Sequence, residues 1–183
     1  CVYAFAGDMG ADCALAAGIK TQVVGQAKTQ PSNAADTMQA AKTLLKQGVD
    51  LLVFVGGDGT ARDLLQAIGD QVPVVGIPAG VKIHSGVYGI TPTAAGQVIA
   101  QLVRGDLVSL RSQEVRDIDE EEFRAGRVKA RYYGELQVPE SHQYMQATKN
   151  GAQEGSKEVE ALVLEDIAAH VEELMELGVR YIM

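Results

Sequence analysis

An aspartate set among glycines is the residue of this chain best placed to do chemistry. Asp58 stands in the sequence Gly56-Gly57-Asp58-Gly59-Thr60, after the apolar stretch 49–55 and before a segment with helical apolar spacing. Glycines let a ligand approach the main chain closely, and the positive end of the following helix favours an anion such as phosphate. A carboxylate there is expected to hold Mg²⁺ or to take the proton of an attacking hydroxyl. The pattern indicates phosphoryl transfer; the simpler alternative is a tight turn in which Asp58 caps the helix.

A second group of polar residues follows the apolar stretch 72–78. Its candidate ligand contacts are Gly80, Lys82, His84 and Ser85. Lys82 could neutralise phosphate charge, and His84 and Ser85 could hydrogen-bond a ribose or a phosphate. The alternative is a solvated Lys82 and a packed His84. Ligands of open α/β sheets bind beyond the carboxyl ends of the strands, so both loops are expected at the same edge.

Asp63 is a further candidate carboxylate. It falls on the first turn of the helix after the glycines, where it is either a second carboxylate beside a metal ion or a residue that stabilises the helix dipole. The sequence shows no metal-ligand set, so Mg²⁺ is implied by the chemistry of phosphoryl transfer alone.

Short apolar strands alternate with amphipathic helices through the first 105 residues. Strands are expected at 2–5, 22–25, 49–55 and 72–78, and helices at about 11–16, 35–45, 61–68 and 92–103. Ser32 or Asn33 is expected to cap the second helix, and Thr91 stands at the start of the fourth. The alternation predicts an α/β fold with a Rossmann-like, doubly wound parallel sheet. The continuous apolar character of 49–55 predicts a strand buried on both faces.

The composition changes after Gly105. Polar and apolar residues alternate at 107–118 and at 127–138, which predicts two half-exposed antiparallel strands. We therefore expect a nucleotide-binding domain over 1–105 and the start of a second, mostly β domain over 106–183. Within the latter, Ser156 is expected to cap a long helix. Because the chain starts with Cys and stops in an apolar run, a truncated second domain is expected.

Composition and charge restrict the partners and the compartment. The chain has 183 residues, of which 46% are hydrophobic, enough for a packed core, and its net charge is −8. The negative charge argues against nucleic acid or an anionic membrane as a partner and favours small molecules. Two cysteines and no visible signal peptide or membrane segment favour the cytoplasm.

Several motifs together resemble one kinase superfamily. The glycine-rich turn 56–60, continued by Ala61-Arg62-Asp63, is similar to the signature of the NAD kinase, diacylglycerol kinase and sphingosine kinase superfamily. With Asp8-Met9-Gly10, the loop 76–85 and Asp117-Ile118-Asp119, the chain most resembles the ATP-NAD kinase-like (AcoX-related) branch.

The resemblance implies a phosphotransferase that uses ATP and Mg²⁺ and has an alcohol group as acceptor. Asp58 would belong to the catalytic centre, and Thr60 would steady a phosphate cradle made by Gly56, Gly57 and Gly59. The implied acceptor is the 2′-hydroxyl of NAD, as in NADP biosynthesis, or a related hydroxyl. NAD kinases carry an Asn-Glu pair that grips NAD, and this sequence has none. The alternative is a non-catalytic nucleotide-binding regulatory or accessory protein, of the kind associated with acetoin catabolism; a homo-oligomer is also compatible with the superfamily.

Overall fold

The computed structural model describes residues 1–80, 83–106, 109–118, 130–141 and 143–146, which belong to one compact unit, Cys1–Thr148. Lys82 and the long helix expected after Ser156 lie outside the described residues. The domain boundary expected after residue 105 stays a prediction.

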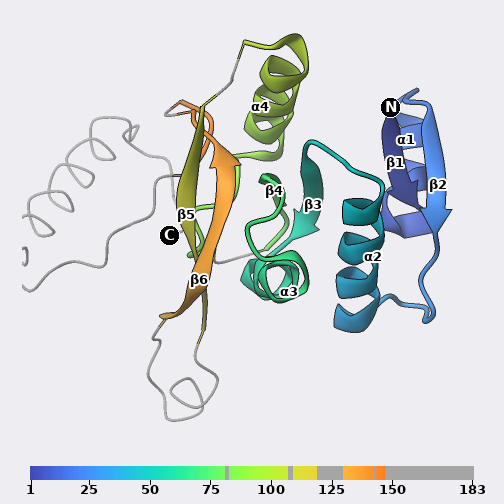
Figure 1. Ribbon diagram of the computed structural model, residues 1–183, viewed down its shortest axis with the longest axis horizontal. Coiled ribbons are helices and arrows are strands. Elements are labelled where there is room, and N and C mark those ends of the chain that lie inside the picture. Colours follow the sequence, from blue (N-terminus) through green and yellow to red (C-terminus); the bar gives the residue numbers. More distant parts are fainter. Residues whose placement is uncertain (81–82, 107–108, 119–129, 142, 147–183) are drawn as a thin grey trace, which may run out of the picture. The chain divides into compact units, whose positions relative to one another are not determined.

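Strands and helices alternate along this unit as the sequence predicts (Figure 1). The order is β1 (Val2–Phe5), the 3₁₀ turn η1 (Gly7–Met9), α1 (Ala11–Ala16), β2 (Thr21–Gly25), α2 (Ala34–Lys46), β3 (Leu52–Gly56), α3 (Asp58–Ile68), β4 (Val74–Pro78), α4 (Pro92–Arg104), β5 (Leu110–Ile118) and β6 (Ala130–Pro139). β1 pairs with β2 and β3 with β4, both in parallel, whereas β5 and β6 are antiparallel. The predicted α/β class, with a Rossmann-like beginning and later β structure, is confirmed.

The expectation that the third strand is buried on both faces is wrong. Leu52 and Phe54 of β3 are buried, but Val53 and Val55 are 41% and 63% exposed. Side chains of a strand point alternately to opposite faces, so only one face of β3 is covered within the described part of the chain. The apolar run 49–55 therefore predicted that a strand forms, but not whether one or both of its faces are buried.

Helix α3 is fixed in the core by one apolar stripe. Ala61, Leu64 and Ile68 recur at spacings of three and four residues and are almost completely buried. The helix packs against β3 and against the antiparallel strands β5 and β6. Burying a Leu or Ile side chain contributes about 1.5–3 kcal/mol, so this stripe holds the N-terminus of α3, where Asp58 lies, in a defined position.

The start of α2 is closed by reciprocal hydrogen bonds. The Asn33 Oδ1 atom accepts from the N–H groups of Ala35 (2.9 Å) and Asp36 (3.2 Å), and Asp36 Oδ2 accepts from the N–H of Asn33 (3.2 Å). This is a capping box, and it identifies Asn33 rather than Ser32 as the cap.

Replacing Asn33 by alanine is expected to lower the free energy of unfolding by about 1 kcal/mol, because two N–H groups of the first turn lose their acceptor. Urea unfolding followed by circular dichroism measures this difference. Ser32→Ala is the control, since the exposed Ser32 does not take part in the box. An equal loss in both variants would contradict the assignment of the cap.

Candidate functional site

The glycine-rich turn joins a strand directly to a helix. β3 ends at Gly56, α3 begins at Asp58, and Gly57 between them is the N-cap residue. The carbonyl oxygen of Gly57 accepts from the N–H groups of Thr60 (2.9 Å) and Ala61 (3.2 Å), and no side chain caps the helix. Asp58 is thus not the cap that the simpler alternative proposed. The positive end of α3 has no side-chain acceptor at its first amides, which suits an approaching anion.

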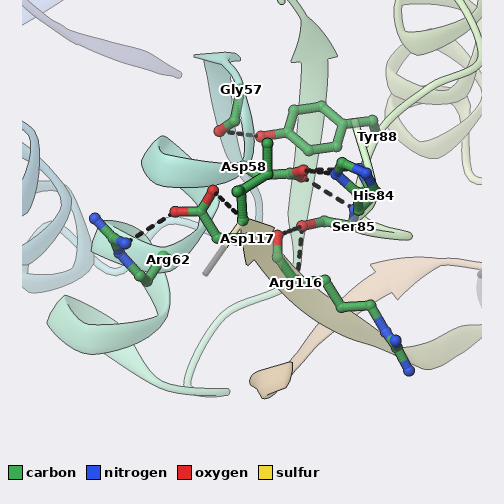
Figure 2. A network of polar contacts seen from close by, with 9 residues as sticks. Gly57, Asp58, Arg62, His84, Ser85, Tyr88, Arg116 and Asp117 are labelled. Carbon is green, nitrogen blue, oxygen red and sulfur yellow. Dashed lines mark hydrogen bonds and ion pairs between the residues drawn. The ribbon is translucent and has the colours of Figure 1, made fainter. Parts of the chain in front are cut away.

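The Asp58 carboxylate faces the loop that follows β4 (Figure 2). Its Oδ2 atom accepts from the His84 main-chain N–H (2.7 Å) and lies 3.0 Å from His84 Nδ1, while Oδ1 accepts from the Ser85 N–H (3.0 Å). The side chain of Asp58 is only 5% exposed. Three N–H donors offset the cost of burying this charge. Through these bonds Asp58 connects the start of α3 to His84 and Ser85, which follow it by 26 and 27 residues.

The hydroxyl of Ser85 is held by the main chain of β5. Ser85 Oγ donates to the Arg116 carbonyl oxygen (2.8 Å) and accepts from the Arg116 N–H (3.0 Å), and the residue is buried. The next amide, that of Gly86, donates to the Glu114 carbonyl oxygen (3.0 Å). The loop that holds Asp58 is therefore itself fixed to β5.

Tyr88 is a member of the site that the sequence analysis missed. Its hydroxyl donates to the Gly57 carbonyl oxygen (2.6 Å), and its ring is buried against Phe54 with an edge-on contact. Burial raises the pKa of the Tyr88 hydroxyl far above its usual value, and the charges of Asp58 and Asp117 add to this effect. The group therefore stays a donor. A tyrosine within an apolar segment was the available signal, because a buried hydroxyl needs a partner.

The two loops also meet through their backbones. The N–H of Ala79 donates to the Gly56 carbonyl oxygen (3.0 Å), and a Cβ atom added at Gly80 would lie 3.8 Å from Gly57 Cα. The Thr60 side chain lies against Gly56, where an added Cβ would come within 2.3 Å of Thr60 Oγ1. At Gly57, by contrast, an added Cβ would meet no atom of the described structure within 4 Å.

These two glycines give a matched pair of substitutions. Gly56→Ala is expected to lower the free energy of unfolding by about 1–3 kcal/mol, because the new methyl group overlaps Thr60. Gly57→Ala should change it by less than about 0.5 kcal/mol, since the space is open and φ is −114°. Urea unfolding of both variants tests this. Similar losses would contradict the close packing of Thr60 on Gly56.

Arg62 and Asp117 form an ion pair between α3 and β5, with Nη1 and Oδ2 2.9 Å apart. The Arg62 guanidinium also lies over the Tyr133 ring, 5.5 Å from its centroid. A Cβ atom added at Gly59 would lie 3.9 Å from Asp117 Oδ2, so this pair borders the glycine-rich turn. Because both side chains are partly exposed, the pair is expected to contribute no more than about 1 kcal/mol.

The predicted carboxylate Asp63 is separate from the contacts of Asp58. Burial raises the pKa of the Asp63 carboxyl, the positive charge of Arg62 opposes this, and Asp117 adds to it. Within the described ranges, Asp63 makes no hydrogen bond or ion pair with Asp58, His84 or Ser85. No group of three or more His, Cys, Asp or Glu side chains is arranged for a metal ion there either. Both Asp58 oxygens already accept N–H donors, and the role of Mg²⁺ stays an expectation from the chemistry of phosphoryl transfer.

Residues 1–107 match the family model described as the ATP-NAD kinase N-terminal domain. The chain belongs to the ATP-NAD kinase family. The predicted NAD kinase-like resemblance is thereby confirmed, and the matched range includes the glycine-rich turn and the loop of His84 and Ser85. No curated protein matches the chain, and neither does a solved structure.

Membership of the ATP-NAD kinase family agrees with a nucleotide-binding α/β unit. In the part of the chain that the structure describes, none of the helices has the length and apolar character needed to span a membrane.

Proposed function

We propose that this member of the ATP-NAD kinase family transfers the γ-phosphoryl group of ATP to a hydroxyl of a small molecule, with the 2′-hydroxyl of NAD as the first candidate acceptor. The observation that carries the proposal is the buried carboxylate of Asp58, located on the first residue of α3, at a helix end without a capping side chain. A purely structural turn does not require a buried carboxylate, and here three N–H donors offset the cost of burying it.

In this proposal the backbone supplies the phosphate contacts. The N–H groups of the turn at Gly56, Gly57 and Gly59 and the positive end of α3 attract the phosphate groups, with the Thr60 hydroxyl beside them. Gly80 borders the same space, because it lies close to Gly57. Positioned dipoles of this kind stabilise the charge that spreads over the transferred phosphoryl group.

The proposal also includes nucleotide contacts by four further residues, which are Asp63, Lys82, His84 and Ser85. Lys82 would add a positive charge to the phosphate site. Mg²⁺ is taken as the ion that ATP carries in solution, and no described residue is assigned to it. The Ser85 hydroxyl donates to Arg116 of β5 and the Ser85 N–H donates to Asp58, so both donor groups of Ser85 are already used within the protein.

One observation favours the second candidate, a nucleotide-binding regulatory or accessory protein. Both Asp58 oxygens are occupied by N–H donors, so the carboxylate could be structural. The chain also lacks the Asn-Glu pair expected for an NAD site. Both features are compatible with a protein that binds ATP without turning it over.

A direct assay separates the two candidates. The full-length protein is incubated with Mg-ATP and, separately, with NAD, NADH or a panel of small hydroxylated metabolites, and products are identified by mass spectrometry. ADP formed together with a phosphorylated acceptor is the result expected for the kinase. ATP binding by calorimetry without ADP formation for any acceptor would contradict the kinase proposal and support the regulatory candidate.

A further inference from the structure

Arg62 brings a positive charge to the edge of the glycine-rich turn. Its Nη1 atom lies 2.9 Å from Asp117 Oδ2, and a Cβ atom added at Gly59 would lie 3.9 Å from the same Asp117 oxygen (Figure 2). Arg62 also follows Asp58 by four residues in α3, so the two side chains leave neighbouring positions of the helix surface. The guanidinium is therefore placed next to the start of α3, where the proposed phosphate contacts lie.

Three carboxylates surround the start of α3. Asp58 and Asp63 belong to the helix itself, and Asp117 extends toward it from β5. Burial is the main reason for the raised pKa of the Asp63 carboxyl and of the Tyr88 hydroxyl, and the charge of Asp117 adds to both shifts. A phosphate that binds at this helix end meets like charges, which costs free energy unless a cation stands beside it.

The Asp117 carboxylate is a replaceable partner of Arg62. The two side chains are 19% and 36% exposed, and ion pairs in contact with solvent contribute little to stability. A guanidinium has five N–H donors in a planar fork, which fits a phosphate as well as a carboxylate. When Arg62 turns to a phosphate, Asp117 Oδ1 keeps the hydrogen bond that it accepts from the N–H of Ile118, which is 2.8 Å long.

The ring of Tyr133 limits where the guanidinium can move. The Arg62 Cζ atom lies 5.5 Å from the centroid of this ring. Tyr133 is the extra residue of a β-bulge, since its two neighbours on β6 pair with successive residues of β5, Val115 and Arg116. Bulges redirect side chains and are frequent beside active sites. Because the ring packs on the hydrophobic core, it provides a fixed surface for the guanidinium.

Arg131 offers Asp117 a second partner. The two residues are paired across β5 and β6, and directly opposite residues of an antiparallel pair have Cβ atoms about 4.5–5.5 Å apart. The Arg131 guanidinium also lies 5.5 Å from the centroid of the Tyr133 ring, and it forms no ion pair within the residues that the structure describes. Arg131 can therefore compensate the charge of Asp117 when Arg62 binds another anion.

We propose that Arg62 binds a phosphate group of the nucleotide, and that this phosphate replaces Asp117 as its partner. The inference rests on the proposed function and assigns to its nucleotide site a residue outside both the turn 56–60 and the loop after β4. The ligand class is a nucleotide with a charged phosphate group, either the donor ATP or the acceptor NAD. No covalent bond changes in this step, because the exchange only moves an ion-pair contact from a carboxylate to a phosphate.

Two substitutions with different expected effects test the exchange in the full-length protein. Arg62→Gln should weaken the binding of Mg-ATP by about 10–100-fold, because charge-assisted hydrogen bonds to a phosphate are lost. Asp117→Asn should leave this affinity unchanged or tighten it by up to about fivefold, because it removes the competing negative charge and frees Arg62. Isothermal titration calorimetry measures both affinities without turnover.

Matched ligands identify which phosphate is bound. ATP, NAD and adenosine are titrated into the wild-type protein and into Arg62→Gln. A larger loss of affinity for ATP assigns Arg62 to the donor, a larger loss for NAD assigns it to the acceptor, and equal losses for both indicate a phosphate position that they share. Adenosine, which has no phosphate, should bind equally well to both proteins.

A charge control and a wild-type spectrum complete the test. Arg104→Gln removes the same charge from an exposed arginine that is paired with Asp106, and it should leave the binding of ATP unchanged. In ¹⁵N-labelled wild-type protein, the Nε–H resonance of Arg62 should shift on saturation with the nucleotide that Arg62 contacts. This spectrum requires no variant to fold.

Different results would contradict different statements. Unchanged binding of ATP and NAD by Arg62→Gln, an equal loss for adenosine, or an unshifted Arg62 resonance would overturn the phosphate contact and leave nucleotide binding in place. Weaker binding by both Arg62→Gln and Asp117→Asn would overturn the exchange and show that the pair only connects α3 to β5. Absence of ATP and NAD binding by the wild-type protein would overturn the proposed function and this inference with it.

Discussion

Asp58→Asn is expected to reduce kcat by about 10²–10⁴-fold, the range attributed to a positioned acid or base. Asparagine keeps the shape of aspartate but replaces one of its oxygens by an NH₂ group. That group would face an N–H donor of His84 or Ser85, so the loop after β4 would lose at least one of its bonds to α3. Steady-state kinetics with the acceptor identified in the assay measure the effect on kcat.

The same substitution is expected to lower the free energy of unfolding by about 1–3 kcal/mol, because a buried N–H group loses its acceptor. Urea unfolding measures this loss, and calorimetry with ATP tests whether the glycine-rich turn still binds the nucleotide. Asp50→Asn, at an exposed carboxylate before β3, is the matched control and should change neither kcat nor the free energy of unfolding. If Asp58→Asn lost stability but kept the wild-type kcat, Asp58 would be structural only.

Features set by neighbouring residues could be predicted from the sequence. The helix cap at Asn33 needs only residues within three positions, and the strand–glycine–helix order around Asp58 follows from local apolar spacing. The antiparallel pair β5–β6 was also predicted, because alternation specifies a half-exposed strand. Each of these depends on short-range patterns.

The contacts that build the site could not be predicted in this way. Asp58 meets His84 over a separation of 26 residues, Arg62 reaches Asp117 on β5, and Tyr88 reaches back to Gly57. Periodicity records which face of an element is apolar, but it carries no information about which polar groups meet across elements. Sequence reasoning therefore named Asp58 and His84 separately and did not identify them as a hydrogen-bonded pair.

Gly76→Ala is expected to lower the free energy of unfolding by about 1–3 kcal/mol, at the upper end of that range. A Cβ atom added at Gly76 would lie 2.5 Å from Tyr88 Cδ1 and 2.9 Å from Phe54 Cζ. Both rings are buried, so neither can move into solvent. Displacing the Tyr88 ring would also pull its hydroxyl from the Gly57 carbonyl oxygen, now 2.6 Å away, and disturb the glycine-rich turn.

Urea unfolding of Gly76→Ala, Tyr88→Leu and the double variant tests this packing. The smaller Leu side chain gives the new methyl group room, so the double variant should be destabilised by less than the sum of the two single changes. Gly96→Ala is the control: Gly96 lies inside α4 with no atom of the described structure within 4 Å of an added Cβ, and alanine should stabilise this helix by about 0.5–1 kcal/mol. The same chemical change is thus expected to have opposite signs at the two sites. Equal losses at Gly76 and Gly96, or full additivity with Tyr88→Leu, would contradict the close contact between β4 and the ring that supports the turn.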